Sequence, residues 1–513
     1  MRLVLVLLLC LVVSLPGIKQ LPADGHEVLV LGSVQEMAAN GDWVVPYFNG
    51  EPRLNKPPLN YWATGLLAWG SGSLPVVLPW HGRLVSVFAA LLLVAFTYLW
   101  GGRITSPRTA QIAAAMMAVS AGVFSYAHDA RPEMLYACLC AVAYLGFGVT
   151  LLEKHRPATP GRVYCCWALL GLATLTKGPQ IPLLLLLALA LFVLFSARAR
   201  ERWSRLHPIS GFLLMAGVIA PWAIALNAAV DSTMLQHSQL GGALLIPELS
   251  NLADPYYLYR PLQLVLPWWI APLALFLLDE QRDLPRHCAF YLLVSICVAA
   301  IGLSFGTQQR FFYMLPYLPM LFLLSAIGIE RLQRSKIGRA LLYFQMLTIF
   351  GVLAWLCYEA RTVREMLAAA LVLLAVAISR RYFRLPQHMP TTIVASCSIA
   401  ALIFGLFGPS DAFWSDDRRH KYQFGSGVIG RLDAGRPIYA WVTNPNVYVY
   451  YARRRIPQIQ ELARFHIDHD QEVLVISPAT RVADLKPYFS ITTVGAMPRD
   501  APDRDVVLAV RHR

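Results

Sequence analysis

The chain has 513 residues, of which 57% are hydrophobic and only 14% are charged, and its mean hydropathy is +0.51. This composition is too apolar for water-soluble globular domains, and runs long enough to cross the hydrocarbon core of a bilayer recur along most of the sequence. A soluble dehydrogenase, a DNA-binding protein and a secreted disulfide scaffold are therefore excluded. The sequence predicts an integral membrane protein.

Apolar runs between residues 3 and 408 predict about thirteen transmembrane helices. The predicted spans are 3–17, 84–100, 109–125, 134–152, 163–176, 179–196, 209–226, 262–278, 287–303, 313–329, 341–357, 365–379 and 391–408. The first run resembles a signal peptide, but residues 14–17 make a poor cleavage site. We expect this run to be retained as a membrane anchor.

The formal net charge of +14 is explained mainly by membrane orientation. With the N-terminus in the cytoplasm, nineteen Lys and Arg residues fall in the loops and flanks of the cytoplasmic side. Apart from a long first loop, 18–83, and the C-terminal tail, the opposite side has only Arg131, Lys177, Arg260, Arg310, Arg361 and Arg364. This asymmetry disfavours a nucleic-acid partner and places the loop and the tail outside the cytoplasm.

The composition changes at residue 408, after which charge becomes frequent and no membrane-length apolar run remains. The predicted fold is therefore an all-α polytopic membrane domain, 1–408, followed by a small extracytoplasmic α/β domain, 409–513. Strands are expected at 437–442, 447–451, 472–477 and 505–511, with a helix at 461–466. The alternative for this tail is a stabilising appendage without chemistry.

Polar residues on the outer face are candidates for function, because the preference of Lys and Arg for cytoplasmic loops does not account for them. The external segments carry Lys56, Arg131, Lys177 and Arg310 at one membrane face. Such a set of cations suits a ligand whose phosphate lies at headgroup level and whose tail lies in the bilayer. The alternative is that each cation reaches ordinary phospholipid headgroups.

The first loop carries the most specific motifs, Gly41–Asp42–Trp43–Val44–Val45–Pro46, Asn49–Gly50, Lys56–Pro57–Pro58 and Tyr61–Trp62. With the later segments 175–179 and 313–319, they resemble the pattern of bacterial aminoarabinose transferases that modify lipid A. Those enzymes belong with the protein O-mannosyltransferases among the GT-C glycosyltransferases. The resemblance covers roughly residues 20 to 330.

The resemblance implies a GT-C fold and an inverting transfer of sugar from an undecaprenyl-phosphate donor. The acceptor would be a lipid or a surface glycan, such as lipid A, at the periplasmic face of a bacterial inner membrane. Membrane lipids, the polyprenyl-phosphate-linked sugar and the acceptor are the expected partners. Neither the sugar nor the acceptor can be named from the sequence.

Carried over residue by residue, the resemblance shows agreement and departure. The acidic pair that opens the first loop in the family appears here as His26–Glu27, so the first acid is a histidine. Lys56, Lys177 and Tyr313 match the family pattern. The further departures are Leu29, Val30, Asn55, Glu133 in place of an aspartate, and His237, which only weakly echoes an external His and Arg.

Sugar transfer from a polyprenyl phosphate needs positive charge on the phosphate that leaves and a base or orienting group for the acceptor. Lys56 and Lys177 are the first candidates for the phosphate, followed by Arg131 and Arg310. Glu27 is the leading catalytic candidate, with His26 as an alternative base and Asp24 as a substitute for the missing acid if the register shifts.

Three further residues of the outer face can be interpreted in more than one way. Glu133 and Tyr313 are candidates for binding the substrate, while Glu133 and Asp129 could instead pair with Arg131 or help hold a divalent cation. No dedicated metal motif is present, so no metal site or cofactor is firmly predicted.

Three other functions remain open at this point. A transporter or flippase of lipid-linked sugars fits the spans, although the sequence shows no internal repeat and its polar residues gather at one face. An O-antigen ligase or polymerase would leave the Lys-Pro-Pro and Thr-Lys-Gly-Pro motifs unexplained. A catalytically silent relative is favoured by the changes at residues 26, 29, 30 and 55.

Overall fold

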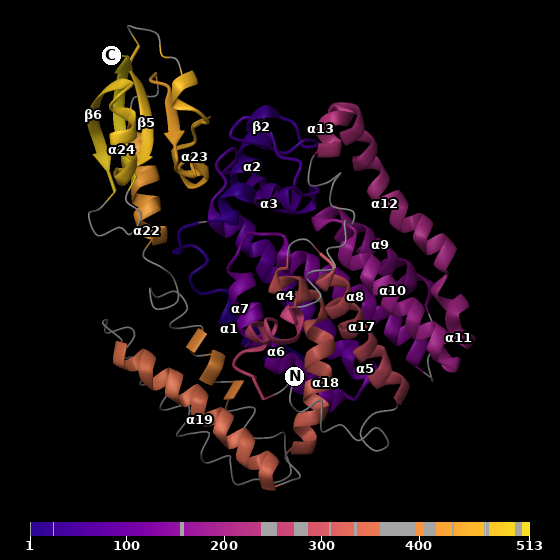
Figure 1. Cartoon of the computed structure of the whole chain (residues 1–513). Coiled ribbons are helices and arrows are strands. Elements are labelled where there is room, and N and C mark those ends of the chain that lie inside the picture. The colour runs from indigo at the N-terminus through magenta and orange to yellow at the C-terminus, as the bar shows by residue number, and fades with distance from the viewer. Residues whose placement is uncertain are drawn as a thin grey trace. The chain divides into compact units, whose positions relative to one another are not determined.

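A computed structural model defines the architecture of the chain (Figure 1). It describes residues 2–23, 25–153, 159–237, 254–270, 286–306, 309–332, 336–359, 396–397, 399–401, 403–404, 417–432, 435–465, 467, 471–497 and 505–512. The predicted span 365–379, most of the span 391–408, and Asp24 lie outside these residues. So do the second part of the predicted span 262–278 and the end of the predicted helix 461–466.

The chain divides into two compact units. The first consists of 1–18, 54–63 and 82–410, and the second of 19–53, 64–81 and 411–513. The second unit therefore combines the greater part of the first external loop with the C-terminal region.

Helices make up the described part of the first unit. Their bounds are α1 (Arg2–Ser14), α4 (Pro79–Leu99), α5 (Gly101–Ile104), α6 (Pro107–Ala118), α7 (Ala121–Ala127), α8 (Glu133–Leu152), α9 (Pro160–Lys177), α10 (Gln180–Phe195), α11 (Ala197–Arg202), η1 (Trp203–Leu206), α12 (Pro208–Ala229), α13 (Ser232–His237), α15 (Tyr256–Tyr259), α16 (Leu262–Val265), α17 (Arg286–Ser304), η4 (Phe311–Tyr317), α18 (Leu318–Leu332) and α19 (Lys336–Glu359). The helix α3 (Leu59–Gly70) begins in this unit and continues into the second.

Within the described residues, five helical segments are long and apolar enough to cross a membrane, and seven if two bent pairs each count as one span. The pairs are α6 with α7, bent by 52°, and α10 with α11 and η1, bent by 110°. The chain is thus a multi-pass membrane protein with a mostly helical fold. The sequence pattern had predicted one unbroken span at 109–125, where the structure has α6 and α7.

A serine explains that break. Ser120 lies between α6 and α7 in extended conformation, and its Oγ accepts a hydrogen bond from the Val123 backbone N–H, which starts a new helix. The backbone N–H of Ala121, the residue after the serine, donates a hydrogen bond to the carbonyl oxygen of Leu266 at 2.7 Å. Two backbone N–H groups at the start of α7 therefore have hydrogen-bond partners inside the membrane unit, which makes the interruption tolerable in an apolar surrounding.

The second unit contains a mixed five-stranded sheet of order β4-β3-β5-β7-β6. Its strands are β3 (Ile438–Trp441), β4 (Gln458–Ile459), β5 (Val473–Pro478), β6 (Phe489–Ala496) and β7 (Asp505–His512). The pairs β3–β4 and β3–β5 are parallel, whereas β5–β7 and β6–β7 are antiparallel. Helices and turns of this region are α22 (Asp417–Tyr422), η6 (Gln423–Val428), η7 (Ile429–Arg431), α23 (Asn446–Ala452), η8 (Leu462–Arg464), η9 (Ala479–Arg481) and α24 (Val482–Leu485).

The secondary structure predicted for the tail was partly wrong. The strands expected at 437–442, 472–477 and 505–511 are present as β3, β5 and β7. The segment expected as a strand at 447–451 is the helix α23, and the helix expected at 461–466 is only the short turn η8. Alternating Val and Tyr favour a strand, but four consecutive side chains of α23 are buried, which a helix wedged between other elements achieves.

The first external loop in this unit forms α2 (His26–Asn40) and a short hairpin of β1 (Tyr47–Phe48) and β2 (Glu51–Pro52). The carboxylate of Glu36 holds the turn of this hairpin, accepting hydrogen bonds from the backbone N–H groups of Asn49 and Gly50. Both residues have positive φ, 58° and 78°. Asn and Gly are the residues that tolerate this conformation best.

The loop and the C-terminal region are joined by specific hydrogen bonds. The Asn49 side chain donates to the carbonyl oxygen of Ile456 at 3.0 Å and accepts from the N–H of Ile456 at 2.7 Å. Two hydroxyls of α23 add further links, from Tyr450 to the carbonyl oxygen of Val77 and from Tyr451 to that of Ala23. The C-terminal region therefore fixes the conformation of the loop within this unit.

We expect Asn49→Gly and Asn49→Ala to distinguish two contributions to the stability of this contact between the loop and the C-terminal region. One is the side-chain hydrogen bonding of Asn49, and the other is its tolerance of positive φ. Both variants lose the paired hydrogen bonds to Ile456, at a cost of about 1–3 kcal/mol, but only the alanine adds strain at positive φ. Hydrogen exchange at residues 456–459 should speed up in both variants, more in the alanine. Asn444→Ala, which removes an exposed turn contact to the Asn446 N–H, is the matched control. Unchanged exchange in both Asn49 variants would contradict the assigned junction.

Candidate functional site

Two antiparallel helices bring together a buried ion pair. Glu133 is the first residue of α8 and Lys177 is the last residue of α9, and the two helices pack against each other. Because they have nearly equal lengths, the start of one meets the end of the other. The Lys177 Nζ donates a hydrogen bond to the Glu133 Oε1 at 3.1 Å, and the two side chains are only 8% and 7% exposed.

A second ion pair adjoins the first. The Arg131 Nε lies 2.5 Å from the Asp129 Oδ2 and 3.9 Å from the Glu133 Oε2. Burial by itself would lower the pKa of the Arg131 guanidinium, but the carboxylates of Asp129 and Glu133 outweigh it and raise that pKa. We call Asp129, Arg131, Glu133 and Lys177 the charge cluster. Its two cations and two carboxylates balance.

Aromatic rings cover the cations of the charge cluster. The Lys177 Nζ lies 4.7 Å from the ring centre of Tyr313 and 4.8 Å from that of Phe312. The Arg131 guanidinium lies 5.4 Å from the same Phe312 ring and 5.5 Å from the ring of Tyr126. Cations this close to ring faces gain electrostatic stabilisation when they are shielded from water. Phe312 therefore contacts both cations and fixes the space between them.

Two buried oxygen atoms on α8 and η4 lack a hydrogen-bond partner among the described residues. They are the Oε2 of Glu133 and the hydroxyl of Tyr317, on the same η4 turn that carries Phe312 and Tyr313. Buried oxygen atoms without partners are rare and costly in native proteins. The Oε2 of Glu133 is therefore available to accept a hydrogen bond from a ligand.

The Lys-Pro-Pro loop adjoins the charge cluster. Lys56 is half-buried just before α3, and Asn60 on the first turn of that helix donates to the carbonyl oxygen of Ala130 at 3.1 Å. Ser86 donates to the neighbouring carbonyl oxygen of Asp129 at 2.6 Å. These bonds hold the backbone next to Arg131 and place the lysine loop beside it.

The structure brings some of the predicted residues together and leaves others apart. Arg131, Glu133, Lys177 and Tyr313 form one site in the first unit. Arg310 is exposed, and its described hydrogen bonds join its backbone to the Tyr257 hydroxyl rather than its side chain to the charge cluster.

The predicted catalytic pair lies in the second unit. His26 and Glu27 form the first turn of α2, where the Glu27 carboxylate favourably faces the positive end of the helix dipole. Glu27 is 3% exposed, whereas His26 is exposed.

Sequence reasoning found Tyr313 but missed the rings of Phe312 and Tyr126, and it left the partner of Arg131 open. Asp129 is that partner, and the spacing of two residues was the signal available. Phe312 lies between two residues already singled out, Arg310 and Tyr313, but nothing in the sequence alone linked its ring to two cations. Within the described residues, no group of three or more His, Cys, Asp or Glu side chains could hold a metal ion.

Part of the chain matches the model of a known family. Residues 55–224 match the family model described as dolichyl-phosphate-mannose-protein mannosyltransferase. The fold resembles a solved oligosaccharyltransferase from Archaeoglobus fulgidus, with 12% identity, a TM-score of 0.54, and 96% of this chain and 72% of that chain covered.

A more specific likeness is to aminoarabinose transferases. The chain is 27% identical over 341 residues to the undecaprenyl phosphate-alpha-4-amino-4-deoxy-L-arabinose arabinosyl transferase of Pseudomonas savastanoi, a match that covers 62% of this chain and 60% of that protein. It therefore spans somewhat less than two thirds of that relative's length. ArnT from Cupriavidus metallidurans, solved bound to undecaprenyl phosphate, shares the fold with a TM-score of 0.77 at 20% identity, covering 99% of this chain and 97% of that one.

These matches confirm the family resemblance seen in the sequence. The chain resembles the aminoarabinose transferases and the protein O-mannosyltransferase-like proteins of the GT-C glycosyltransferase family. Its mostly helical membrane fold with a C-terminal mixed-sheet domain is ArnT-like.

Proposed function

We propose that this protein is an inverting glycosyltransferase that moves a sugar from undecaprenyl phosphate to a lipid or surface-glycan acceptor at the periplasmic face of a bacterial inner membrane. The observation that carries the proposal is the charge cluster. Two cations covered by aromatic rings lie at one end of α8 and α9, beside the Lys-Pro-Pro loop, in a chain similar to transferases that use this class of donor.

In the proposed reaction, an acceptor oxygen attacks the anomeric carbon of the sugar and the bond from that carbon to the phosphate oxygen breaks. The phosphate leaves with the bonding electrons, so its negative charge rises and fixed cations stabilise it. Lys56, Lys177 and Arg131 are assigned to this role, with Arg310 as a further cation at the rim. The acceptor proton passes to the carboxylate of Glu27, with His26 as the alternative base.

Glu133 is assigned to the sugar. One carboxylate oxygen, Oε1, is held by Lys177, and the other, Oε2, accepts no hydrogen bond within the described residues. A sugar hydroxyl or amino group can donate a hydrogen bond to this Oε2, with the ring of Tyr313 close by. The lysine therefore has two tasks, orienting Glu133 before the phosphate departs and stabilising the phosphate as it leaves.

The proposed topology has about thirteen spans, a cytoplasmic N-terminus, a membrane domain of residues 1–408 and a periplasmic domain of residues 409–513. Single cysteines placed at Arg200 and Arg481, both exposed, would test it in a background without native cysteines. A reagent that cannot cross the inner membrane should label the second position only. Labelling of the first position in intact cells would contradict the orientation.

The function itself is tested by supplying the purified protein with an undecaprenyl-phosphate sugar and a membrane-lipid extract. We expect sugar transfer, and a loss of about 100-fold or more in Lys56→Ala, because one donor to the leaving oxygen is removed. Lys19→Ala, which removes an exposed lysine that stacks on Trp80, is the matched control. Binding of a lipid-linked sugar without transfer in the unmodified protein would favour a transporter or a silent relative.

A further inference from the structure

A second surface of interest lies at the end of α10 remote from Lys177. After Phe195 the chain turns by 110°, and the short helices α11 and η1 lead into the long apolar helix α12. The sixteen residues of α10 separate this turn from Lys177 by roughly 24 Å. The surface is therefore distinct from the charge cluster.

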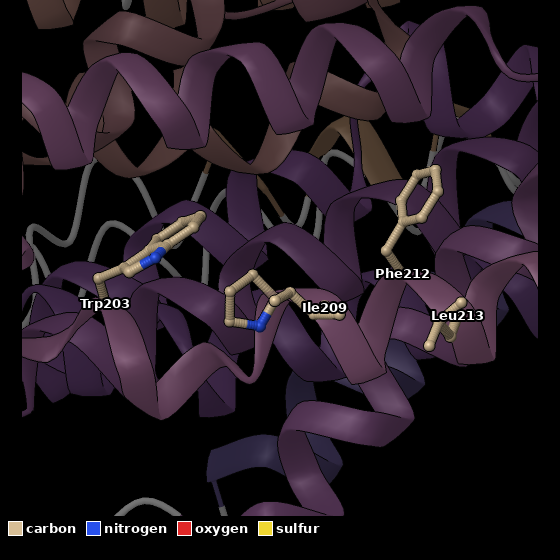
Figure 2. A pocket seen from close by; sticks show the side chains of 5 residues that line it. Trp203, Ile209, Phe212 and Leu213 are labelled. Atoms are coloured by element: carbon tan, nitrogen blue, oxygen red, sulfur yellow. The ribbon is translucent and has the colours of Figure 1, made fainter.

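Five apolar residues line a shallow groove at this turn, with a volume of about 440 Å³: Trp203, Pro208, Ile209, Phe212 and Leu213. Figure 2 shows the labelled side chains in a row, with Trp203 at one end and Phe212 and Leu213 at the other. Ile209, Phe212 and Leu213 are 79%, 52% and 66% exposed. A tryptophan beside such a row is typical of the boundary between headgroups and acyl chains.

The groove has a rigid floor. The Trp167 indole N–H donates to the carbonyl oxygen of Leu206 at 2.9 Å, and Gly211 packs so closely on the same indole that a Cβ there would lie 2.1 Å from its nitrogen. Tyr164 donates to or accepts from Ser210 at 3.0 Å and stacks on His207. The groove is therefore formed before any ligand arrives.

Positive charge surrounds the polar end of the groove. The segment 197–206 has four arginines and a single acid, Glu201. Two of the arginines have partners within the protein, since Arg202 donates to the carbonyl oxygens of Leu151 and Glu153, and Arg198 contacts His287. Burial and the charges of Arg205 and Arg198 lower the pKa of Arg202, as expected among crowded cations.

The side chains of the other two arginines lack such partners. Arg200 and Arg205 are exposed, and neither guanidinium group forms a hydrogen bond or ion pair with another described residue. These features match an anionic diacyl lipid. The apolar surface suits an acyl chain, the tryptophan suits the interface, and the two guanidinium groups without protein partners suit the phosphate.

We propose that this groove binds an anionic glycerophospholipid, with one acyl chain along Ile209, Phe212 and Leu213 and its phosphate on Arg200 and Arg205. The site is independent of the sugar donor, and the bound lipid fixes the depth of the α10–α12 turn in the membrane. A polyprenyl phosphate has the same phosphate chemistry, but its branched isoprenoid chain differs from a straight acyl chain.

The test is native mass spectrometry of the full chain, released from nanodiscs that contain equal amounts of phosphatidylglycerol and phosphatidylcholine with identical acyl chains. We expect retained phosphatidylglycerol in excess. In Arg200→Gln/Arg205→Gln the ratio of the two bound lipids should fall, by roughly fivefold for each cation removed. The ratio is measured within one folded sample, so a change in yield does not affect it.

Arg103→Gln/Lys336→Gln is the matched control, because both residues are exposed cations that do not line the groove. This variant should keep the ratio of the unmodified protein. Equal binding of the two lipids by the unmodified protein, or an unchanged ratio in Arg200→Gln/Arg205→Gln, would overturn the proposal. Displacement of phosphatidylglycerol by an equal amount of undecaprenyl phosphate would also overturn it, because the occupant would then be a polyprenyl lipid.

Discussion

Lys177→Met is expected to lower the free energy of unfolding by about 3–5 kcal/mol and to abolish sugar transfer. The substitution leaves the Glu133 carboxylate buried, with only Arg131 at 3.9 Å to balance it, and an uncompensated buried charge is strongly destabilising. Chemical unfolding in detergent measures the first effect, and the transfer assay with an undecaprenyl-phosphate sugar measures the second.

A double variant separates stability from function. In Glu133→Leu/Lys177→Met both charges are replaced by apolar side chains of similar volume, which often recovers most of the stability. We expect unfolding to return to within about 1–2 kcal/mol of the unmodified protein while transfer stays absent. Arg108→Met, which removes a half-exposed ion pair with Glu330, should cost at most about 1 kcal/mol. Transfer retained by the double variant would show that the cluster is structural only.

Glu27→Gln is expected to reduce transfer by about 100- to 10,000-fold, the usual contribution of a general base. Glutamine keeps the shape of the side chain but accepts no proton, so the loss should appear in kcat more than in KM. The Glu51→Gln variant, which changes an exposed carboxylate of the same loop, should behave like the unmodified protein.

Variants of the adjacent His26 distinguish between the two candidate bases, the Glu27 carboxylate and the His26 imidazole. If the Glu27 carboxylate takes the acceptor proton, His26→Gln should reduce kcat only a few fold, and His26→Asp should preserve or raise it. If the imidazole is the base, His26→Gln should cause the larger loss, and activity should fall as pH drops through the histidine range. Full activity in both Glu27→Gln and His26→Gln would remove the pair from the proposed mechanism.

The mostly helical, multi-pass character of the fold was predictable because the length of the hydrophobic runs is a strong signal. The bounds of α8 and α12 follow the predicted spans closely. Breaks were not predictable, because the start of α7 depends on a serine cap and on a carbonyl oxygen from Leu266, far away in the sequence. In the tail, the Val and Tyr residues of α23 favoured a strand until burial between other elements overrode that preference.

The candidate site shows a similar division. The charge pattern predicted Arg131 and Lys177 at one membrane face, and the family resemblance added Tyr313. In the structure both cations lie within 4 Å of the Glu133 carboxylate, and Lys177 lies 4.7 Å from the ring centre of Tyr313. Which carboxylate each cation contacts, and the position of Phe312 between them, depend on the packing of α8, α9 and η4. Apart from the pair Asp129–Arg131, whose members are two residues apart, most of these contacts join residues far apart in the chain and leave no local trace in the sequence.

The bond between Asn49 and Ile456 also has a consequence for biosynthesis. The two residues are separated by 407 positions, so at about 5–20 residues per second the asparagine waits on the order of 20–80 s for its partner. The sheet beside it waits longer still, because β7 lies between β5 and β6 and is the last strand to be synthesised. The loop that carries Glu27 therefore reaches its final conformation only after the membrane spans between Asn49 and Ile456 have been synthesised.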